Sequence, residues 1–256
     1  MSESAEKGIE PIDGKCSFVL PDREKLEALA EFAAGAGHEI NNPLATIIGR
    51  AQLLLKDERD PQRRQMLMSI GAQAYRIRDM IGDAMLFGRP PHPELNDLPL
   101  SEIIAKVTNN QAGILAIENC QVVSTVPDSI FLRADPVQFA IVMTELIRNS
   151  RQALHPDGGV IKISAGIEGP NAIIEVHDQG KGFSEIESRH AFDPFFSGRQ
   201  AGRGLGFGLS KCWRIIEQHS AKIEIESTLA GPTTIRIRWP LASDPHPSLF
   251  NEQTSN

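Results

Sequence analysis

The stretch His38-Glu39-Ile40-Asn41-Asn42-Pro43-Leu44 lies inside a long helical pattern. From residue 26 into this stretch, apolar residues follow alternating steps of three and four, which is the spacing of a helix that packs on another helix. These residues are Leu26, Leu29, Ala33, Ala36 and Ile40, and the pattern continues through Leu44, Ile47, Ala51 and Leu54. The extra step after Ile40 falls beside Pro43, where we expect a kink because proline removes a backbone donor.

A second helical pattern follows after a short turn. Asp60 is predicted to cap this helix, with Pro61 at its first position. The apolar positions are Met66, Ile70, Ala74, Ile77, Ile81 and Ala84. Two antiparallel helices with one apolar stripe each cannot bury both stripes by themselves. Two symmetric hairpins can bury them by forming a four-helix bundle. The sequence therefore predicts a homodimer, and the proline-rich run at 90–93 predicts a linker.

The remaining chain, from about 95 to 242, alternates between helical and extended patterns. Helices are predicted over 100–117 and from Asp135-Pro136, as cap and first position, to about 154. Strands are predicted over 121–126, 129–132, 160–164, 172–176, 222–226 and 234–238. These elements predict a helix-covered mixed sheet.

Composition excludes several classes of protein. With 256 residues, of which 41% are hydrophobic, the chain can bury one or two ordinary cores. The net charge of -7 argues against a general binder of nucleic acid or anionic membranes, because both need basic surface. The apolar runs are shorter than the roughly 18 to 20 residues that cross a bilayer, and no signal pattern begins the chain. We therefore expect a cytoplasmic protein without a membrane span. Its three scattered cysteines predict neither a disulfide framework nor a zinc site.

Several motifs occur in an order that resembles the sensor histidine kinases of two-component signalling. They are the H box at 38–44, the N box at 144–153, the G1 box at 178–182, the F box at 192–196 and the G2 box at 202–210. The resemblance extends from about residue 26 to residue 241. It implies an α plus α/β fold: a HisKA-type dimerisation and phosphoacceptor hairpin in a dimeric four-helix bundle, then an α/β-sandwich ATP-binding domain of the Bergerat, GHKL or HATPase type.

The H box supplies the first candidate residues. The family pattern H-E-x-x-N-P falls on His38, Glu39, Asn42 and Pro43 without a gap. The resemblance implies that His38 accepts a phosphoryl group, Glu39 is its base, and Asn42 can orient water to dephosphorylate the partner. His38 lies about 200° around the helix from Ala36, so it should project away from the packed seam. A histidine without these neighbours would be interpreted as an ordinary exposed residue. Glu39, Asn42, Pro43 and the downstream nucleotide-binding motifs instead favour the role of phosphoryl acceptor.

The N box adds a candidate metal site. Glu145 and Asn149 are four residues apart on one helical face, so a carboxylate and an amide oxygen can reach one Mg²⁺ or its waters. Many family members have asparagine where this chain has Glu145. The alternative is the solvated face of an amphipathic helix.

The G1 box follows a predicted strand directly. The resemblance implies that the carboxylate of Asp178 accepts a hydrogen bond from the exocyclic amine of adenine, while Gly180 and Gly182 allow close backbone approach. The same Asp-x-Gly-x-Gly turn also occurs in unrelated loops, so this motif alone is only moderately specific.

The G2 box places glycines at the start of a helix, where exposed amides and the helix dipole favour phosphate oxygens. These glycines are Gly204, Gly206 and Gly208. Arg199 and Arg203 either neutralise phosphate charge or are ordinary solvated residues. Leu205 replaces the threonine usual in the family, which removes a hydroxyl contact.

Together these features predict a kinase that uses ATP and Mg²⁺ to phosphorylate its own His38, in the same or the opposite protomer. The phosphoryl group would then pass to an aspartate of a response-regulator receiver domain on a separate chain. The short N-terminus implies sensing through a partner protein or a domain on another chain. Two alternatives stay open: a nucleotide-gated pseudokinase scaffold, supported by Leu205, and an ATPase or serine kinase of the same superfamily.

The predicted boundaries are 1–21 (lead-in), 22–89 (phosphoacceptor domain), 90–94 (linker), 95–242 (ATP-binding domain) and 243–256 (tail).

Overall fold

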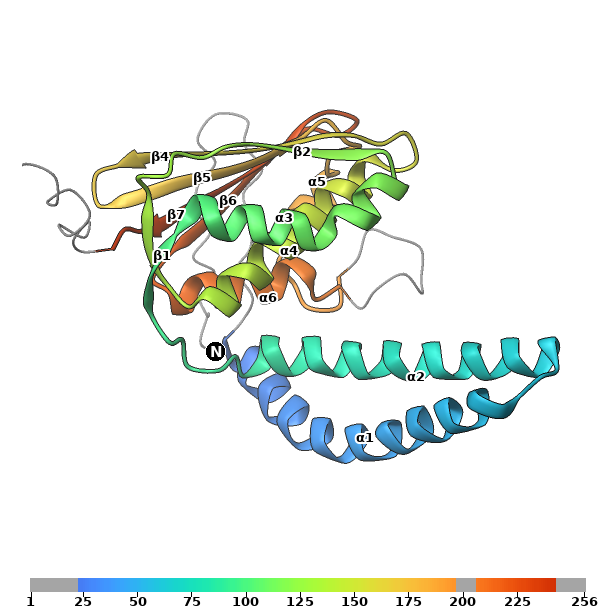
Figure 1. Cartoon of the computed structure of the whole chain (residues 1–256). Helices are drawn as coiled ribbons and strands as arrows, with labels where there is room; N and C mark the ends of the chain where they lie inside the picture. Colours follow the sequence, from blue (N-terminus) through green and yellow to red (C-terminus); the bar gives the residue numbers. More distant parts are fainter. Residues whose placement is uncertain (1–22, 197–205, 243–256) are drawn as a thin grey trace, which may run out of the picture. The chain divides into compact units, whose positions relative to one another are not determined.

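The computed structural model describes residues 23–196 and 206–242, and of residues 23–34, 36 and 38 it describes only the backbone. The chain divides into two compact units (Figure 1). The hairpin unit comprises Val19–Pro91 with Ala191–Lys211. The sheet unit contains His92–His190 and continues from Cys212.

The hairpin unit contains two long helices, α1 (Arg23–Asp57) and α2 (Pro61–Gly88). α1 continues through Pro43 without interruption, and Figure 1 shows it curved. α2 begins as predicted, because the side chain of Asp60 accepts hydrogen bonds from the N–H groups of Gln62 and Arg63. The sequence also predicts Asp22 as the cap of α1, and this residue lies outside the described residues.

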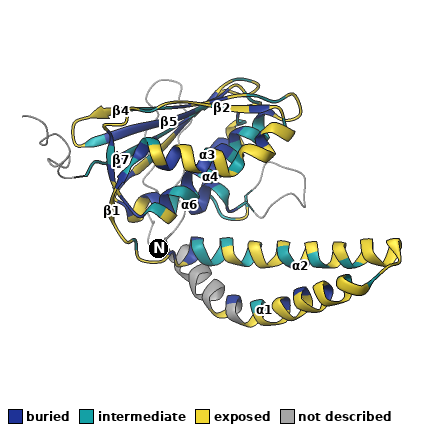
Figure 2. Ribbon diagram, viewed as in Figure 1, coloured by how far each residue is buried: buried dark blue, intermediate teal, exposed yellow. Residues whose placement is uncertain are grey.

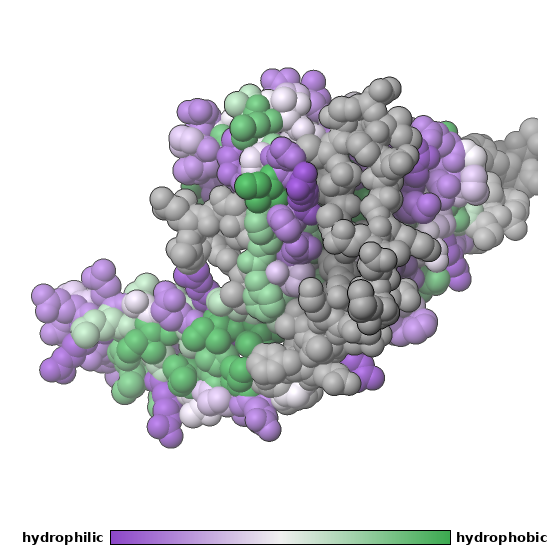
Figure 3. Space-filling model, turned by 180° about the vertical axis from the view of Figure 1, so that it is seen from behind, coloured by the Kyte–Doolittle hydropathy of each residue, from purple (hydrophilic) through white to green (hydrophobic). Residues whose placement is uncertain are grey.

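Only part of the apolar surface of the hairpin is buried within one chain. Leu44 and Ile48 of α1 pack against Ala74 of α2, with Ile40 and Tyr75 at the edge of this cluster. Five residues of the predicted stripes stay exposed, namely Ile47, Leu54, Met66, Ile70 and Ile77. Figure 3 shows hydrophobic residues gathered along this part of the molecule. We call these five residues the outer stripe.

The sheet unit is built on a five-stranded mixed sheet with the order β2-β4-β5-β7-β6. The strands are β2 (Cys120–Thr125), β4 (Gly159–Glu168), β5 (Asn171–Asp178), β6 (Lys222–Ser227) and β7 (Thr233–Pro240). β2 pairs with β4 in parallel, and the other pairs are antiparallel. A separate antiparallel pair joins β1 (Asn96–Pro99) to β3 (Phe131–Ala134). β1 was not predicted, since four residues are too few to show a strand periodicity.

Helices α3 (Leu100–Ile117), α4 (Pro136–Leu154) and α6 (Gly208–Gln218) lie along one face of this sheet (Figure 1). Side chains alternate along β7 between the face that the helices cover and the opposite face. The apolar side chains Ile235, Ile237 and Trp239 are buried, whereas Arg236 and Arg238 are partly exposed. Figure 2 shows buried residues on both the strands and the helices. The short helix α5 (Glu185–Arg189), which Ser184 caps, was not predicted.

Within residues 23–196 and 206–242, none of the helices has an apolar stretch long enough to cross a membrane.

Candidate functional site

The second half of α4 carries the N-box residues. Glu145 is 5% exposed and forms an ion pair with Arg148, one turn later on the same helix. Asn149 follows, and its Nδ2 is a buried atom for which the described residues supply no hydrogen-bond partner. A buried amide donor without a partner costs on the order of 1–3 kcal/mol, so a ligand acceptor at this position would be favoured.

Asp178 lies at the last position of β5 and is 3% exposed. Its Oδ1 accepts a hydrogen bond from the backbone N–H of Gly180 at 3.0 Å. Burial raises the pKa of the Asp178 carboxyl, although hydrogen bonds from the Ser150 hydroxyl and the Gly180 N–H, and the nearby His177, oppose this shift. The site therefore holds a carboxyl group in a dry environment, where a hydrogen bond to a neutral donor gains strength.

The G1 loop is fixed to the end of α4. The backbone N–H of Lys181 donates to the carbonyl of Ala153 at 3.1 Å. A Cβ on Gly180 would collide with Ala153, and Gly182 has a positive φ of 63°, where a Cβ would meet the carbonyl of Thr228. Both glycines are therefore required by close approach between segments of the protein itself. This attachment, with the bond from Ser150 to Asp178, holds the G1 loop against the second half of α4.

Ser150 belongs to this site, and sequence reasoning missed it. It is 2% exposed, and its hydroxyl bonds to the carboxyl of Asp178. Its position directly after Asn149 was the available signal. The Ser150 hydroxyl reaches Asp178 only because α4 packs close to the end of β5, and no local sequence pattern predicts that packing.

The G2 box is described only in part. Gly206 has a φ of 76°, and a Cβ there would collide with the carbonyl of Phe196. Gly208 is the first residue of α6, as predicted for a helix that begins at the glycines. The other predicted residues of this region, Arg199, Arg203, Gly204 and Leu205, lie outside the described residues.

Within the hairpin unit, the end of the G2 box contacts α2. The ring of Phe207 lies 5.7 Å from that of Phe87 and 4.8 Å from that of Phe195, measured between centroids. The ammonium of Lys211 donates to the carboxylate of Asp83 at 2.5 Å. None of these contacts was predicted, since no local sequence pattern connects the residues that each contact joins.

The H box lies on α1 in the hairpin unit. Glu39 and Asn42 are exposed, and the hydroxyl of Thr46 donates to the carbonyl of Asn42 at 3.2 Å. Gly37, immediately before His38, is buried, and a Cβ there would meet the side chain of Met85 on α2. The side chain of His38 is outside the described residues, so its predicted direction stays a prediction.

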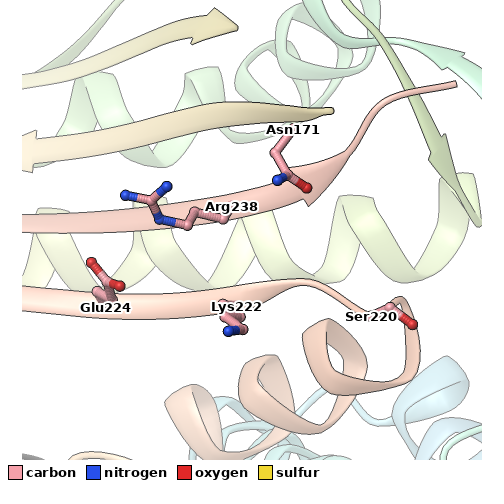
Figure 4. Close-up of a pocket in the computed structure, with 5 residues that line it drawn as sticks. All are labelled: Asn171, Ser220, Lys222, Glu224 and Arg238. Carbon is pink, nitrogen blue, oxygen red and sulfur yellow. The ribbon is translucent and has the colours of Figure 1, made fainter. Parts of the chain in front are cut away.

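A polar concavity lies elsewhere on the sheet unit. Figure 4 shows its lining side chains, which come from β5, β6 and β7 and the turn before β6: Asn171, Ser220, Lys222, Glu224 and Arg238. Asn171 begins β5 and Asp178 ends it, which separates this concavity from the Asp178 site by about 23 Å of strand. We assign no ligand to it.

Comparisons with known proteins identify two domain families in the chain. The His Kinase A (phospho-acceptor) domain family matches residues 28–93, and the histidine kinase-, DNA gyrase B- and HSP90-like ATPase family matches residues 134–243. Sporulation kinase C of Bacillus subtilis is 28% identical over 225 residues, which are 87% of this chain and 51% of that kinase. The sensory histidine kinase/phosphatase NtrB of Klebsiella oxytoca is 34% identical over 238 residues, covering 86% of this chain and 66% of NtrB.

Among solved structures, full-length ShkA in complex with AMPPNP superposes with a TM-score of 0.74 at 18% identity. The match covers 85% of this chain and 47% of ShkA, and it shows the likeness of the fold alone. The chain spans about half the length of the first curated relatives that it matches, with 51% and 44% of the two sporulation kinases covered.

Proposed function

Because the chain contains both domains of the sensor histidine kinase core and belongs to that family, we propose that it is an ATP-dependent autokinase whose acceptor is His38. We assign the phosphoacceptor domain to residues 22–89 and the ATP-binding domain to residues 95–242. The phosphoryl group then passes to an aspartate on a receiver domain in trans. We also propose that the kinase receives its signal from a separate sensor protein.

The nucleotide site carries this proposal. The carboxyl of Asp178 is dry, and the buried Nδ2 of Asn149 has no hydrogen-bond partner among the described residues. Ser150 follows Asn149 and bonds to Asp178, which brings the two groups to neighbouring positions. The carboxyl suits the exocyclic amine of adenine, because guanine presents a carbonyl oxygen at that position and would be repelled. The amide lies on the neighbouring helix, where it can face the phosphates.

The proposed transfer needs alignment and a base. The breaking bond joins the γ-phosphorus to the bridging oxygen of ADP, and the forming bond joins the γ-phosphorus to a ring nitrogen of His38. Glu39, the exposed neighbour of His38, takes the ring proton. Phosphoryl transfer requires little covalent help beyond positioning and neutralisation of charge, so these few residues suffice.

Mg²⁺ is proposed as the counter-ion of ATP. Glu145, which is ion-paired with Arg148, and Asn149 carry oxygen ligands one turn apart, which suits a hard cation. The described residues contain no cluster of three or more His, Cys, Asp or Glu side chains able to hold a metal alone. An ion here would therefore complete its shell with phosphate oxygens and water, as Mg²⁺ commonly does. When bound, it would neutralise phosphate charge.

We further propose that the outer stripe mediates homodimerisation. Its five apolar side chains are 43% to 66% exposed in one chain, and a second hairpin would cover them. Ile70→Glu is expected to convert the dimer to a monomer in light scattering, because it would bury a charge in an apolar interface. Ala72→Glu is the matched control: Ala72 is also exposed on α2 but lies about 200° around the helix from Ile70. A dimeric Ile70→Glu variant, or equal effects of both changes, would contradict the assignment.

A phosphatase role is proposed for Asn42. Its exposed side chain lies one turn beyond His38, too far to act as the base for that imidazole but suitably placed to hold water against a docked acyl phosphate. We expect Asn42→Ala to slow dephosphorylation of the phospho-regulator on the order of tenfold or more, with autophosphorylation nearly unchanged. The assay follows phosphate loss with ADP present.

Thr46→Ala is the control for Asn42→Ala, because it removes only the hydroxyl bond to the carbonyl of Asn42. Full phosphatase activity in Asn42→Ala, or a wild type without any, would remove this role from Asn42.

Acid stability of the incorporated phosphate tests the overall proposal against its alternatives. Wild-type chain incubated with γ-labelled ATP should acquire label that acid removes and alkali preserves, as expected of phosphohistidine. Acid-stable label would indicate a serine kinase. Release of phosphate without label would indicate an ATPase, and nucleotide binding without either would indicate a pseudokinase scaffold.

A further inference from the structure

Asp135 joins three segments of the sheet unit. It is 8% exposed, and its Oδ1 caps α4 by accepting from the N–H groups of Val137 at 2.8 Å and Gln138 at 3.0 Å. Its Oδ2 accepts from the backbone N–H of Glu94 in the predicted linker, at 2.9 Å. Its own backbone N–H donates to Nε2 of His219 at 3.1 Å. One residue thus connects the linker, the start of α4 and the end of α6.

His219 is held as a neutral imidazole at this junction. Its Nδ1–H donates to the carbonyl of Ile215 at 2.8 Å, which leaves Nε2 as the acceptor for Asp135. Burial lowers the pKa of His219, while the carbonyl of Ile215 and the charge of Asp135 oppose the shift. The ring is 5% exposed and lies 4.8 Å from the ring of Trp239, whose indole N–H donates to the carbonyl of Arg133.

The junction lies at the start of α4 and at the end of α6, opposite the helix ends that carry Asn149 and Gly208. Asn149 lies about 21 Å along α4 from Asp135, and Gly208 lies about 16 Å along α6 from His219, at 1.5 Å per residue. Midway along these helices, the thiol of Cys212 on α6 contacts the carbonyl of Val142 on α4. A helix transmits displacement along its axis, so movement at the junction would shift the phosphate end. The backbone of Asp178 pairs with Thr233 of β7, so the sheet holds this residue in place while its carboxyl also bonds to Ser150 of α4.

We propose that Asp135 and His219 are positioning residues that couple the linker to the phosphate-binding ends of α4 and α6. The inference rests on the proposed autokinase function. Their coupling sets the geometry of phosphoryl transfer, while adenine binding depends on Asp178. Loss of the junction should therefore lower the rate of transfer and leave nucleotide affinity nearly unchanged. A purely structural role would instead lower the melting temperature and reduce both properties together.

The linker side is tested with a matched pair of variants in the full chain. Glu94 is exposed, and only its backbone N–H bonds to Asp135. Glu94→Pro removes that N–H, whereas Glu94→Ala removes the side chain and keeps the N–H. We expect Glu94→Pro to slow autophosphorylation at saturating ATP about tenfold, with the Kd for ATP within about threefold of wild type, and Glu94→Ala to match wild type.

The α6 side is tested with His219→Phe and His219→Gln. Phenylalanine retains an aromatic ring against Trp239 but removes the acceptor for Asp135, and glutamine restores an acceptor oxygen. His219→Phe should reproduce the Glu94→Pro result and His219→Gln should recover most of the rate. Because both losses act through Asp135, the double variant Glu94→Pro/His219→Phe should be little slower than either single variant.

The combined outcome decides the inference. Unchanged rates in Glu94→Pro and His219→Phe, equal losses of rate and ATP affinity, or a Glu94→Ala variant as slow as Glu94→Pro would each overturn it. If the wild type itself acquires no acid-labile label, the proposed function fails instead. If His219→Phe does not fold, the Glu94 pair decides alone, since Glu94 is exposed.

Discussion

His38→Gln is expected to abolish autophosphorylation while the Kd for ATP stays within about twofold of wild type. The lone pair of an amide nitrogen is delocalised into the carbonyl, so glutamine is polar but lacks the nucleophilic nitrogen of imidazole. ATP binding should survive because Asp178 and Asn149 belong to the sheet unit and the H box belongs to the hairpin unit. Labelling with γ-labelled ATP and calorimetry with an ATP analogue measure the two properties separately.

His92→Gln is the matched control for the acceptor. His92 is also exposed, and its ring contacts only the carbonyl of the neighbouring Pro93 among the described hydrogen bonds. We expect normal labelling of this variant. Label retained by His38→Gln would show that another residue is the acceptor.

Asp178→Asn is expected to weaken ATP binding ten- to a hundredfold. The substitution replaces a buried acceptor by an amide that can turn a donor toward the adenine amine. The loss of such a charge-assisted bond is on the order of 1.5 to 3 kcal/mol. Asp128→Asn, at an exposed position, provides the control in the same calorimetric titration. An unchanged Kd in Asp178→Asn would contradict the assignment of the adenine site.

The raised pKa of Asp178 adds a dependence on pH. As pH falls through the raised folded-state pKa, the carboxylate gains a proton and loses acceptor strength, so wild-type ATP affinity should fall and that of Asp178→Asn should not. Stability changes in the opposite sense: between the unfolded pKa near 3.8 and the raised folded pKa, the folded state binds more protons, and stability decreases as pH rises. Asp178→Asn should therefore be at least as stable as wild type at neutral pH, because it carries no buried charge.

Sequence alone predicted the features that depend on nearby residues. Asp60 with Pro61 and Asp135 with Pro136 both cap helices as expected, because a cap needs partners only two or three residues away. The strands of the five-stranded sheet also appear where alternation predicted them, with ends that differ by a few residues. In the candidate site, Asn149 lies on the predicted helix, and Asp178 ends β5, two residues beyond the predicted strand 172–176.

Features that depend on distant pairs were missed. Ser150 and Asp178 are 28 residues apart, and Asp135 and His219 are 84 residues apart. No local pattern signals either contact. The seam of α1 also differs in detail, because Ile48 is buried against α2 while Ile47 stays on the outer stripe. A helix that packs on one helix of its own chain and on another across a dimer needs two adjacent apolar stripes. The sequence pattern does not show which stripe faces which partner.

The central claim is that ATP bound at Asp178 and Asn149 phosphorylates His38. Its most direct test is to locate the phosphate on the wild-type chain by proteolysis at alkaline pH, which preserves phosphohistidine, followed by mass spectrometry of the peptides. We predict the modification on the peptide that contains His38, with fragment ions that place it on the imidazole, and its absence when ATP is omitted. Phosphate located on any other residue, or none on a chain that binds ATP, would contradict the claim.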